Sequence, residues 1–264
     1  MKRLSCAANL HFGGDILNSK ILYEELCPAE FTERLSVCPV AYLTLGTLEW
    51  HGPHLPLGSD IIQPMELFKM LAKEIGGIVM PPLFLAPDFV THGEGVDYYG
   101  MDNYFDWTIE KYETQQMVGS AYWVSDELFR AILLAVASNI SRAGFKILVA
   151  HGHGPAVNMF RSLADEVLQK YKLECISPWD FGKEEKLMFQ SDHAAYNETS
   201  IVMACRPELV QMERIEKGGE KIIGVGSVNP CGNASAELGN EIFRVNIADL
   251  KNGILKSLQI WDTP

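Results

Sequence analysis

The chain has 264 residues, and its 34 acidic against 22 basic residues give a net charge of −12, which argues against nucleic acid and acidic membranes as partners. A hydrophobic fraction of 47% and a charged fraction of 21% are those of an ordinary globular protein and exclude a chain that is disordered throughout. No apolar segment reaches the length of about 18 residues that a membrane span needs, and the six cysteines are scattered without Cys-x-x-Cys spacing, so we expect a cytoplasmic protein.

Apolar runs typical of buried strands alternate with helical periodicity along the chain. Residues 37–45 are predicted to form a buried strand, followed over residues 46–58 by a loop rich in Gly, Pro and His. Ser59 and Asp60 stand where a helix would be capped, and apolar residues then recur at steps of three and four until two glycines end the helix. Residues 78–80 begin a second strand.

The same order recurs in the middle of the chain. A helix is expected to bury the face formed by Leu128, Ile132, Val136 and Ile140. Residues 145–150 are predicted as a strand, residues 151–155 as a His-rich loop, residues 157–171 as a helix and residues 173–177 as the next strand. This alternation predicts an α/β protein with three layers, in which helices cover both faces of a mostly parallel central sheet.

The stretch of residues 97–126 interrupts the alternation. Its aromatic residues, which are separated by acidic side chains, are Tyr98, Tyr99, Tyr104, Phe105, Trp107, Tyr112, Tyr122 and Trp123. We expect an aromatic-rich insertion within one domain that spans residues 1–264. It is either a packed excursion that contacts another subunit or a lid over the active site, and the two interpretations are compatible.

Both His-rich loops directly follow predicted strands, and ligands of parallel sheets collect beyond the carboxyl ends of the strands. The first loop carries Glu49 and His51, whose spacing of two projects both to one side of an extended backbone, and Asp60 follows at the predicted helix start. The second loop carries His151 and His153. We therefore expect both loops to open onto one edge of the sheet.

A third cluster, over residues 192–200, contributes His193 and Glu198. Together, the three segments offer three carboxylates and two imidazoles: Glu49, His51, Asp60, His153 and Glu198. Carboxylates that are held close together resist joint ionisation unless a cation lies among them. This donor set suits one or two divalent ions such as zinc, manganese or iron.

Three blocks of the sequence resemble the creatininase family of metal-dependent amidohydrolases. GTLEWHGPHLPLGSD, at residues 46–60, is similar to the family loop Gly-x-x-Glu-x-His-Gly-Pro-His-Leu-Pro-x-x-x-Asp. HAAYNETS, at residues 193–200, is similar to the family pattern of His-Ala-Gly followed by Glu-Thr-Ser. HGHGPAVN, at residues 151–158, is a looser match to Asn-Gly-His-Gly-Gly-Asn. The blocks occur in the order that the family shows.

The resemblance implies a creatininase-like fold with a site for two divalent metal ions. It assigns metal-binding positions to Glu49, His51, Asp60, His153 and Glu198. Asp60 would bridge the ions, Glu198 would steer the attacking water, and His193 would deliver a proton to the leaving nitrogen. The implied reaction is hydrolysis of a C–N bond in a small cyclic or linear amide by a metal-activated water.

Two departures from the family pattern concern the substrate. Pro155 stands where creatininase itself has a carboxylate, so Glu198 would have to supply the missing oxygen ligand, and His151 replaces the usual Asn. Two alternatives therefore stay open: a family member that acts on a peptide or formamide in cofactor biosynthesis, and a binding protein without turnover on the same scaffold.

Four residues are candidates for contact with the substrate: Trp50, His151, Trp179 and Tyr196. The resemblance also implies that the chain assembles as a homo-oligomer, in the manner of the family's hexamers. The expected partner is a small-molecule amide, with no role for nucleic acid or membrane.

Overall fold

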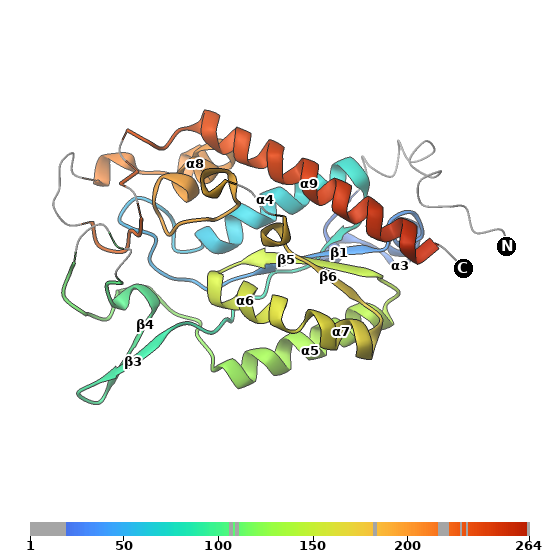
Figure 1. The fold of residues 1–264 in the computed structure, drawn as a ribbon, viewed down its shortest axis with the longest axis horizontal. Helices are drawn as coiled ribbons and strands as arrows, with labels where there is room; N and C mark the ends of the chain where they lie inside the picture. The colour runs from blue at the N-terminus through green and yellow to red at the C-terminus, as the bar shows by residue number, and fades with distance from the viewer. Residues whose placement is uncertain are drawn as a thin grey trace.

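The computed structural model describes residues 20–105, 108, 111–181, 184–215, 222–227, 229–230 and 232–262 (Figure 1). The strands are β1 (Val40–Leu45), β2 (Ile78–Val79), β3 (Val90–Gly93), β4 (Val96–Tyr99), β5 (Ile147–Gly152) and β6 (Glu174–Ile176). The α-helices are α3 (Pro28–Val37), α4 (Ser59–Ile75), α5 (Asp126–Arg142), α6 (Gly154–Ser162), α7 (Ala164–Tyr171), α8 (Tyr196–Cys205) and α9 (Ala236–Asp262). The 3-10 helices are η1 (Tyr23–Glu25), η2 (Gly100–Asp102), η3 (Pro178–Asp180), η4 (Glu185–Leu187), η5 (Pro207–Leu209) and η6 (Met212–Arg214).

A parallel sheet in the order β2–β1–β5–β6 forms the middle layer. The two central strands pair in register from Val40 opposite Ile147 to Leu45 opposite Gly152, so their carboxyl ends finish at the same edge. Helices α4, α8 and α9 cover one face of the sheet, and α5, α6 and α7 cover the other (Figure 1). This arrangement confirms the predicted three-layer α/β fold with a mostly parallel sheet.

Strand β1 is apolar at nearly every position because its side chains alternate between two buried layers. Tyr42 stacks on Phe68 of α4, with ring centroids 5.6 Å apart, and belongs to the core beneath α4, α8 and α9. Leu43 points the other way and shares a core with Phe129 of α5. The strand begins only at Val40, because α3 occupies the preceding residues up to Val37.

Helix α5 buries a different face from the one the spacing predicts. Ser125 caps the helix by accepting a hydrogen bond from the Leu128 backbone N–H, and Leu128 is 51% exposed. The buried residues are Phe129, Leu133, Ala137 and Ile140. Of the predicted face, Ile140 is buried and Val136 packs partly buried against the same core, whereas the prediction was wrong for Leu128. Apolar residues occupy several adjacent positions of this helix, so spacing alone does not say which of them face the sheet.

Other boundaries differ by a few residues. β5 extends through His151 and Gly152, which were expected in the following loop. The helix expected over residues 157–171 is divided at Leu163 into α6 and α7. The N-cap of α4 is Gly58, and the Ser59 hydroxyl instead donates to the Pro56 carbonyl.

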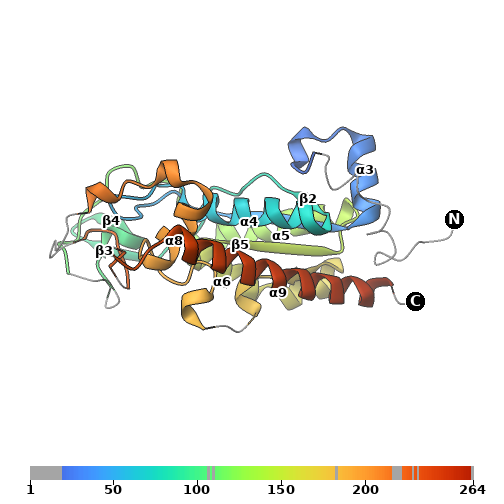
Figure 2. The same cartoon turned by 90° about the horizontal axis from the view of Figure 1, so that it is seen from above.

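The aromatic-rich insertion packs on the loop that follows β1. The antiparallel β3–β4 hairpin, which opens it, lies at the end of the molecule opposite α3 and the last turns of α9 (Figure 2). Tyr99 stacks on Trp123, with ring centroids 4.6 Å apart, and the Trp50 indole N–H donates to the Val118 carbonyl. Trp107 lies outside the described residues. A role for this insertion as lid or subunit contact stays a prediction.

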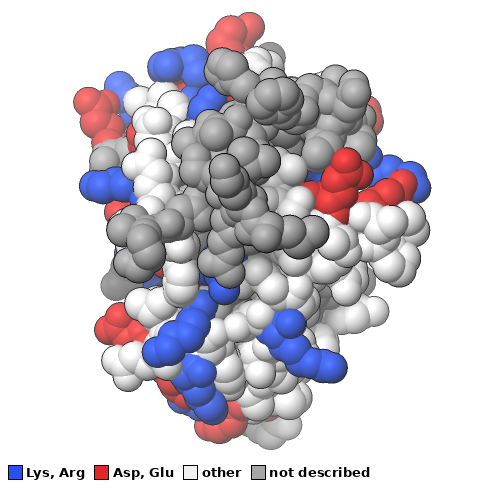
Figure 3. Space-filling model, turned by 90° about the vertical axis from the view of Figure 1, so that its right-hand side faces the viewer, with Lys and Arg blue, Asp and Glu red and all other residues white. Residues whose placement is uncertain are grey.

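The opposite end of the molecule, formed by α3 and the end of α9, carries both Lys or Arg and Asp or Glu side chains (Figure 3). Among the helices that the structure describes, none is long and apolar enough to span a bilayer. Cys27, Cys175 and Cys205 are free thiols and Cys38 is buried, whereas Cys6 and Cys231 lie outside the described residues.

Candidate metal centre

The predicted ligands meet beyond the carboxyl ends of β1 and β5. The loop after β1 brings Glu49 and His51, the first turn of α4 brings Asp60, the N-cap of α6 is His153, and the first turn of α8 brings Glu198. These five residues are all buried, with 4% or less of their surface exposed. Segments that are far apart in the sequence thus form one compact cluster.

The end of β5 is shaped so that His153 reaches this cluster. Gly152 has a φ of +150°, and a Cβ there would lie 1.6 Å from the Leu45 carbonyl oxygen. The next residue, His153, donates its backbone N–H to the same oxygen at 2.8 Å. A glycine is therefore required where the strand passes this close to β1.

Helix α8 positions Glu198 by means of a carboxylate at its start. Asp192 accepts hydrogen bonds from the backbone N–H groups of Asn197 and Glu198, at 2.8 and 3.1 Å. The Glu198 carboxylate turns back and accepts from the Ala194 backbone N–H at 2.8 Å. This folded turn directs Glu198 inward rather than into solvent.

Two groups of side chains share Asp60. In the first, His153 Nδ1 lies 3.0 Å from Glu49 Oε1 and 3.2 Å from Asp60 Oδ2. In the second, His51 Nε2 lies 3.4 Å from Asp60 Oδ1 and 3.5 Å from Glu198 Oε2. Within each group, the candidate ligand atoms lie within 4.8 Å of one another. Asp60 thus offers one carboxylate oxygen to each group.

Burial and mutual charge perturb the whole cluster. Burial raises the pKa of Glu49 to about 7 and that of Glu198 to about 8, because each carboxylate loses its hydration. Burial alone would lower the pKa of His51, but the neighbouring Asp60 and Glu198 carboxylates raise it to about 10. Three buried carboxylates therefore create a strong local demand for positive charge.

The donor atoms fit divalent cations. His51 Nε2 and Asp60 Oδ2 are buried, yet neither makes a hydrogen bond within the described part of the chain. Buried polar atoms are normally hydrogen-bonded, so such atoms call for another partner. Three carboxylates and two imidazoles match the mixed oxygen and nitrogen coordination of zinc and manganese.

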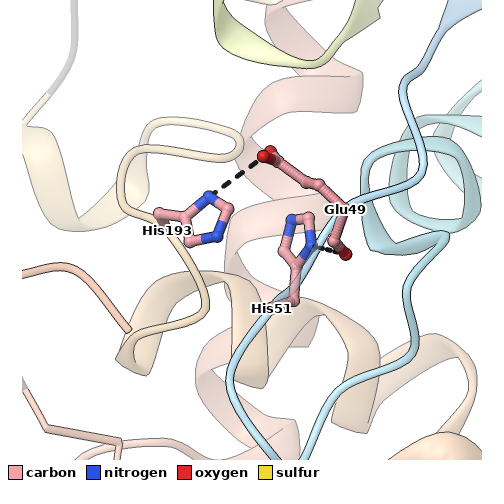
Figure 4. A group of neighbouring side chains, drawn as sticks. All are labelled: Glu49, His51 and His193. Atoms are coloured by element: carbon pink, nitrogen blue, oxygen red, sulfur yellow. Dashed lines mark hydrogen bonds and ion pairs between the residues drawn. The ribbon is translucent and has the colours of Figure 1, made fainter. Parts of the chain in front are cut away.

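His193 packs against Glu49 and His51 of this cluster (Figure 4). Its ring stacks on His51, with centroids 4.3 Å apart, and Nδ1 lies 3.8 Å from Glu49 Oε1. Nε2 lies 2.7 Å from the Trp50 carbonyl oxygen. Burial, with a contribution from His51, lowers the pKa of His193 to about 3. This imidazole is therefore neutral at physiological pH.

Asp88 and Gln190 also belong to the site, although no sequence motif predicts them there. Asp88, just before β3, places Oδ1 3.6 Å from His153 Nε2. Gln190 directs its side-chain Nε2 to Asp60 Oδ1 and Glu198 Oε1, at 3.3 and 3.4 Å. Each residue stands in a loop whose path depends on tertiary packing, so spacing gives no signal for them.

A cavity of about 730 Å³ opens onto the cluster. Its larger apolar wall residues are Phe89, Met101, Phe105, Trp179 and Met188. Of the four predicted substrate residues, Trp179 lies in this wall, whereas Trp50, His151 and Tyr196 do not line the described cavity. His151 faces the interior instead, with Nδ1 3.2 Å from Ser177 Oγ and Nε2 3.3 Å from the Phe189 carbonyl oxygen.

Comparison with solved structures agrees with this architecture. A crystal structure of creatinine amidohydrolase (creatininase) superposes with a TM-score of 0.69, covers 91% of this chain and 98% of its own, and is 20% identical. The structure named creatininase Mn has a TM-score of 0.65 and 21% identity, with 91% of this chain and 99% of that chain covered. At these identities the likeness shows the fold.

Sequence comparison identifies the family of the chain. The creatinine amidohydrolase of Pseudomonas putida is 25% identical over 212 residues, which are 75% of this chain and 77% of that protein. A mycofactocin precursor peptide peptidase of Mycobacterium ulcerans (strain Agy99) is 23% identical over 252 residues, which are 88% of this chain and 91% of that protein. The family model of creatininase, which is described as creatinine amidohydrolase, matches residues 24–250. The chain therefore belongs to the creatininase family.

Proposed function

We propose that the protein is a metal-dependent hydrolase that cleaves the C–N bond of an amide. The observation that carries this proposal is the geometry of Asp60, whose two carboxylate oxygens each face a separate group of ligands. In the proposed site, Glu49 and His153 would hold one divalent cation, His51 and Glu198 would hold a second, and Asp60 would contribute one carboxylate oxygen to each. A cation pair of this kind supplies an activated water and polarises the substrate carbonyl.

The chain itself supplies the means to move a proton. Because a carbonyl oxygen only accepts hydrogen bonds, the contact with Trp50 requires that His193 Nε2 carry the ring proton. His193 Nδ1, which lies nearest Glu49, then has a lone pair directed toward the cluster. The direction of Nδ1 thus places His193 to accept a proton from the attacking water and to return it to the leaving nitrogen.

The size of the cavity favours a substrate larger than a small cyclic amide as a second candidate. A volume of about 730 Å³ with aromatic and methionine side chains in the wall can hold a group of several amino acids. The similarity to a peptide peptidase over 88% of this chain supports a peptide as that substrate. Turnover assays distinguish a small-amide substrate from a peptide substrate. They compare creatinine, a formamide compound and short peptides, and the peptides include one with an aromatic and one with an aliphatic side chain.

Asp60→Asn tests the metal-dependent chemistry. The variant is expected to lose both bound metals and at least a thousandfold in turnover, because one neutral amide cannot replace a bridging carboxylate. Elemental analysis of purified protein measures the metal content. Asp102→Asn is the matched control, since Asp102 is similarly buried and, among the described residues, accepts from the backbone N–H groups of Tyr99 and Met117 rather than facing the cluster.

If Asp60→Asn retained its full metal content, the proposed site would be contradicted.

The alternative is a binding protein without turnover on the same scaffold. A wild-type protein that holds well below one metal per chain and hydrolyses none of the amides would favour this alternative. We also propose that the protein is cytoplasmic and assembles as a homo-oligomer. The exposed apolar side chains of Phe84 and Phe89, before the insertion, and of Tyr122, within it, support the assembly. Light scattering of the purified chain tests this assembly.

A further inference from the structure

The two ring nitrogens of His153 face opposite sides. Nδ1 faces the Glu49 and Asp60 carboxylates, at 3.0 and 3.2 Å. Nε2 is buried without a hydrogen-bond partner among the described residues, and Asp88 Oδ1 lies 3.6 Å from it, slightly beyond hydrogen-bond distance. The side chains of His153 and Asp88 are 6% and 2% exposed, so water does not compete freely for this contact. Asp88 therefore lies on the side of the ring that points away from the proposed cation.

Asp88 is held by other hydrogen-bond donors. Oδ1 accepts from the Phe89 backbone N–H at 2.7 Å, and Oδ2 accepts from the Trp123 indole N–H at 3.2 Å. The Trp123 ring is itself fixed by its stack on Tyr99. Because the oxygens of a carboxylate accept hydrogen bonds, the group of His153 that complements Asp88 Oδ1 is an N–H rather than a lone pair.

The backbone at Gly100 packs closely against the Asp88 carboxylate. Gly100 has a φ of +47°, and a Cβ at that position would lie 2.1 Å from Asp88 Oδ2 and 2.8 Å from Glu49 Oε2. The turn at Gly100 therefore brings the backbone directly against both acids. A longer side chain at position 88 would not fit, and the carboxylate cannot move far from the imidazole.

We propose that Asp88 is a positioning residue that keeps His153 in the tautomer protonated at Nε2. This tautomer presents the Nδ1 lone pair to the cation held with Glu49 and Asp60, so the inference rests on the proposed function. A carboxylate behind a ligating imidazole fixes the orientation of the ring and increases its basicity as a ligand. Asp88 acts through His153 and needs no contact with the cation or the substrate.

Asp88→Asn tests this role, because the amide keeps the shape of the side chain but must turn its NH₂ toward one of the donors. We expect one of two bound Zn²⁺ ions to bind about 10- to 100-fold more weakly, as measured by competition with a chromophoric chelator. Asp102→Asn, the control variant already introduced, is expected to keep both wild-type affinities even if its melting temperature falls. Equal Zn²⁺ affinities in Asp88→Asn and the wild type would overturn the inference.

A second measurement needs no variant and so does not depend on whether Asp88→Asn folds. Long-range ¹H–¹⁵N spectra of the Zn²⁺-loaded wild type are expected to show His153 protonated at Nε2 with Nδ1 bound to metal. Protonation at Nδ1 would overturn the inference while leaving the metal-dependent function intact. A wild type that binds no Zn²⁺ would instead overturn both the proposed function and the role of Asp88.

Discussion

His54 belongs to the same loop as Glu49 and His51, but its side chain contacts α8 rather than the cluster of carboxylates. Its Nε2 lies 2.8 Å from Thr199 Oγ1 on α8, and the residue is 1% exposed. Burial, with a contribution from the nearby charge of His51, lowers its pKa to about 4. This imidazole joins the loop after β1 to α8 as a neutral hydrogen-bonding group.

The depressed pKa of His54 predicts a pH-dependent stability. The unfolded imidazole binds protons below about pH 6.5, whereas the folded one binds them only near pH 4. The stability that His54 contributes is therefore complete above pH 6.5 and is lost as the pH falls toward 4, by about 3 kcal/mol in total. His54→Gln, which keeps a polar group for Thr199 but does not titrate, is expected to lose less stability over this range.

Urea unfolding of the wild type and His54→Gln at pH 7, 5.5 and 4.5 measures the difference. Carboxylates that titrate in both proteins cancel in the comparison, so the difference isolates the imidazole. Parallel pH profiles for the two proteins would contradict a buried neutral His54.

Residue-level prediction from the sequence was possible where a motif fixes the local backbone. The close spacing of Glu49 and His51 in the loop after β1 and of Asp60 at the start of α4 predicted that their side chains lie together, and the structure brings these residues together. Asp88 and Gln190 gave no such signal, because no local spacing links them to the ligands that they contact. Only the packing of the insertion and of the segment before α8 brings them to the site.

At the level of elements, α5 illustrates how apolar spacing leaves a rotation undecided. Phe129 is fully buried among the side chains of β1 and α6, while its neighbour Leu128 is 51% exposed. One residue of shift turns a helix by about 100°, which is enough to exchange a core position for a solvent position.

Paired truncations on α5 test its orientation. Phe129→Ala is expected to reduce the free energy of unfolding by about 3–5 kcal/mol, because it leaves a cavity in the core. Leu128→Ala is expected to change it by no more than about 0.5 kcal/mol, because this side chain is largely in solvent. Urea denaturation at pH 7 measures both values, and a larger loss in Leu128→Ala would contradict the observed face.

The strands were predictable because β1 and β5 are buried on both faces and read as continuous apolar runs. The exact ends of these strands could not be predicted from the sequence. β5 continues through His151 because Ser177 and the Phe189 carbonyl satisfy that imidazole inside the protein. The break at Leu163 carries neither Gly nor Pro, so the division between α6 and α7 has no sequence signal.

On the scale of the whole molecule, the site joins elements from both sides of the sheet. Asp60 belongs to α4 and Glu198 to α8, on one face, whereas His153 begins α6 on the other. Without cations, the three buried carboxylates repel one another across this junction. Bound cations would therefore stabilise the packing of the layers as well as the site.

If the proposed cations are bound, their removal is expected to lower the melting temperature of the entire chain. A ligand that binds only the folded state at a thousandfold excess over its Kd contributes about 4 kcal/mol, which for a chain of this size corresponds to about 10 °C. Differential scanning calorimetry with and without EDTA, followed by readdition of Zn²⁺, measures this shift and its reversal. Asp60→Asn should show no response to EDTA, because its sites are already lost. An equal response in both proteins would mean that the chelated ion stabilises the molecule from somewhere other than the cluster around Asp60.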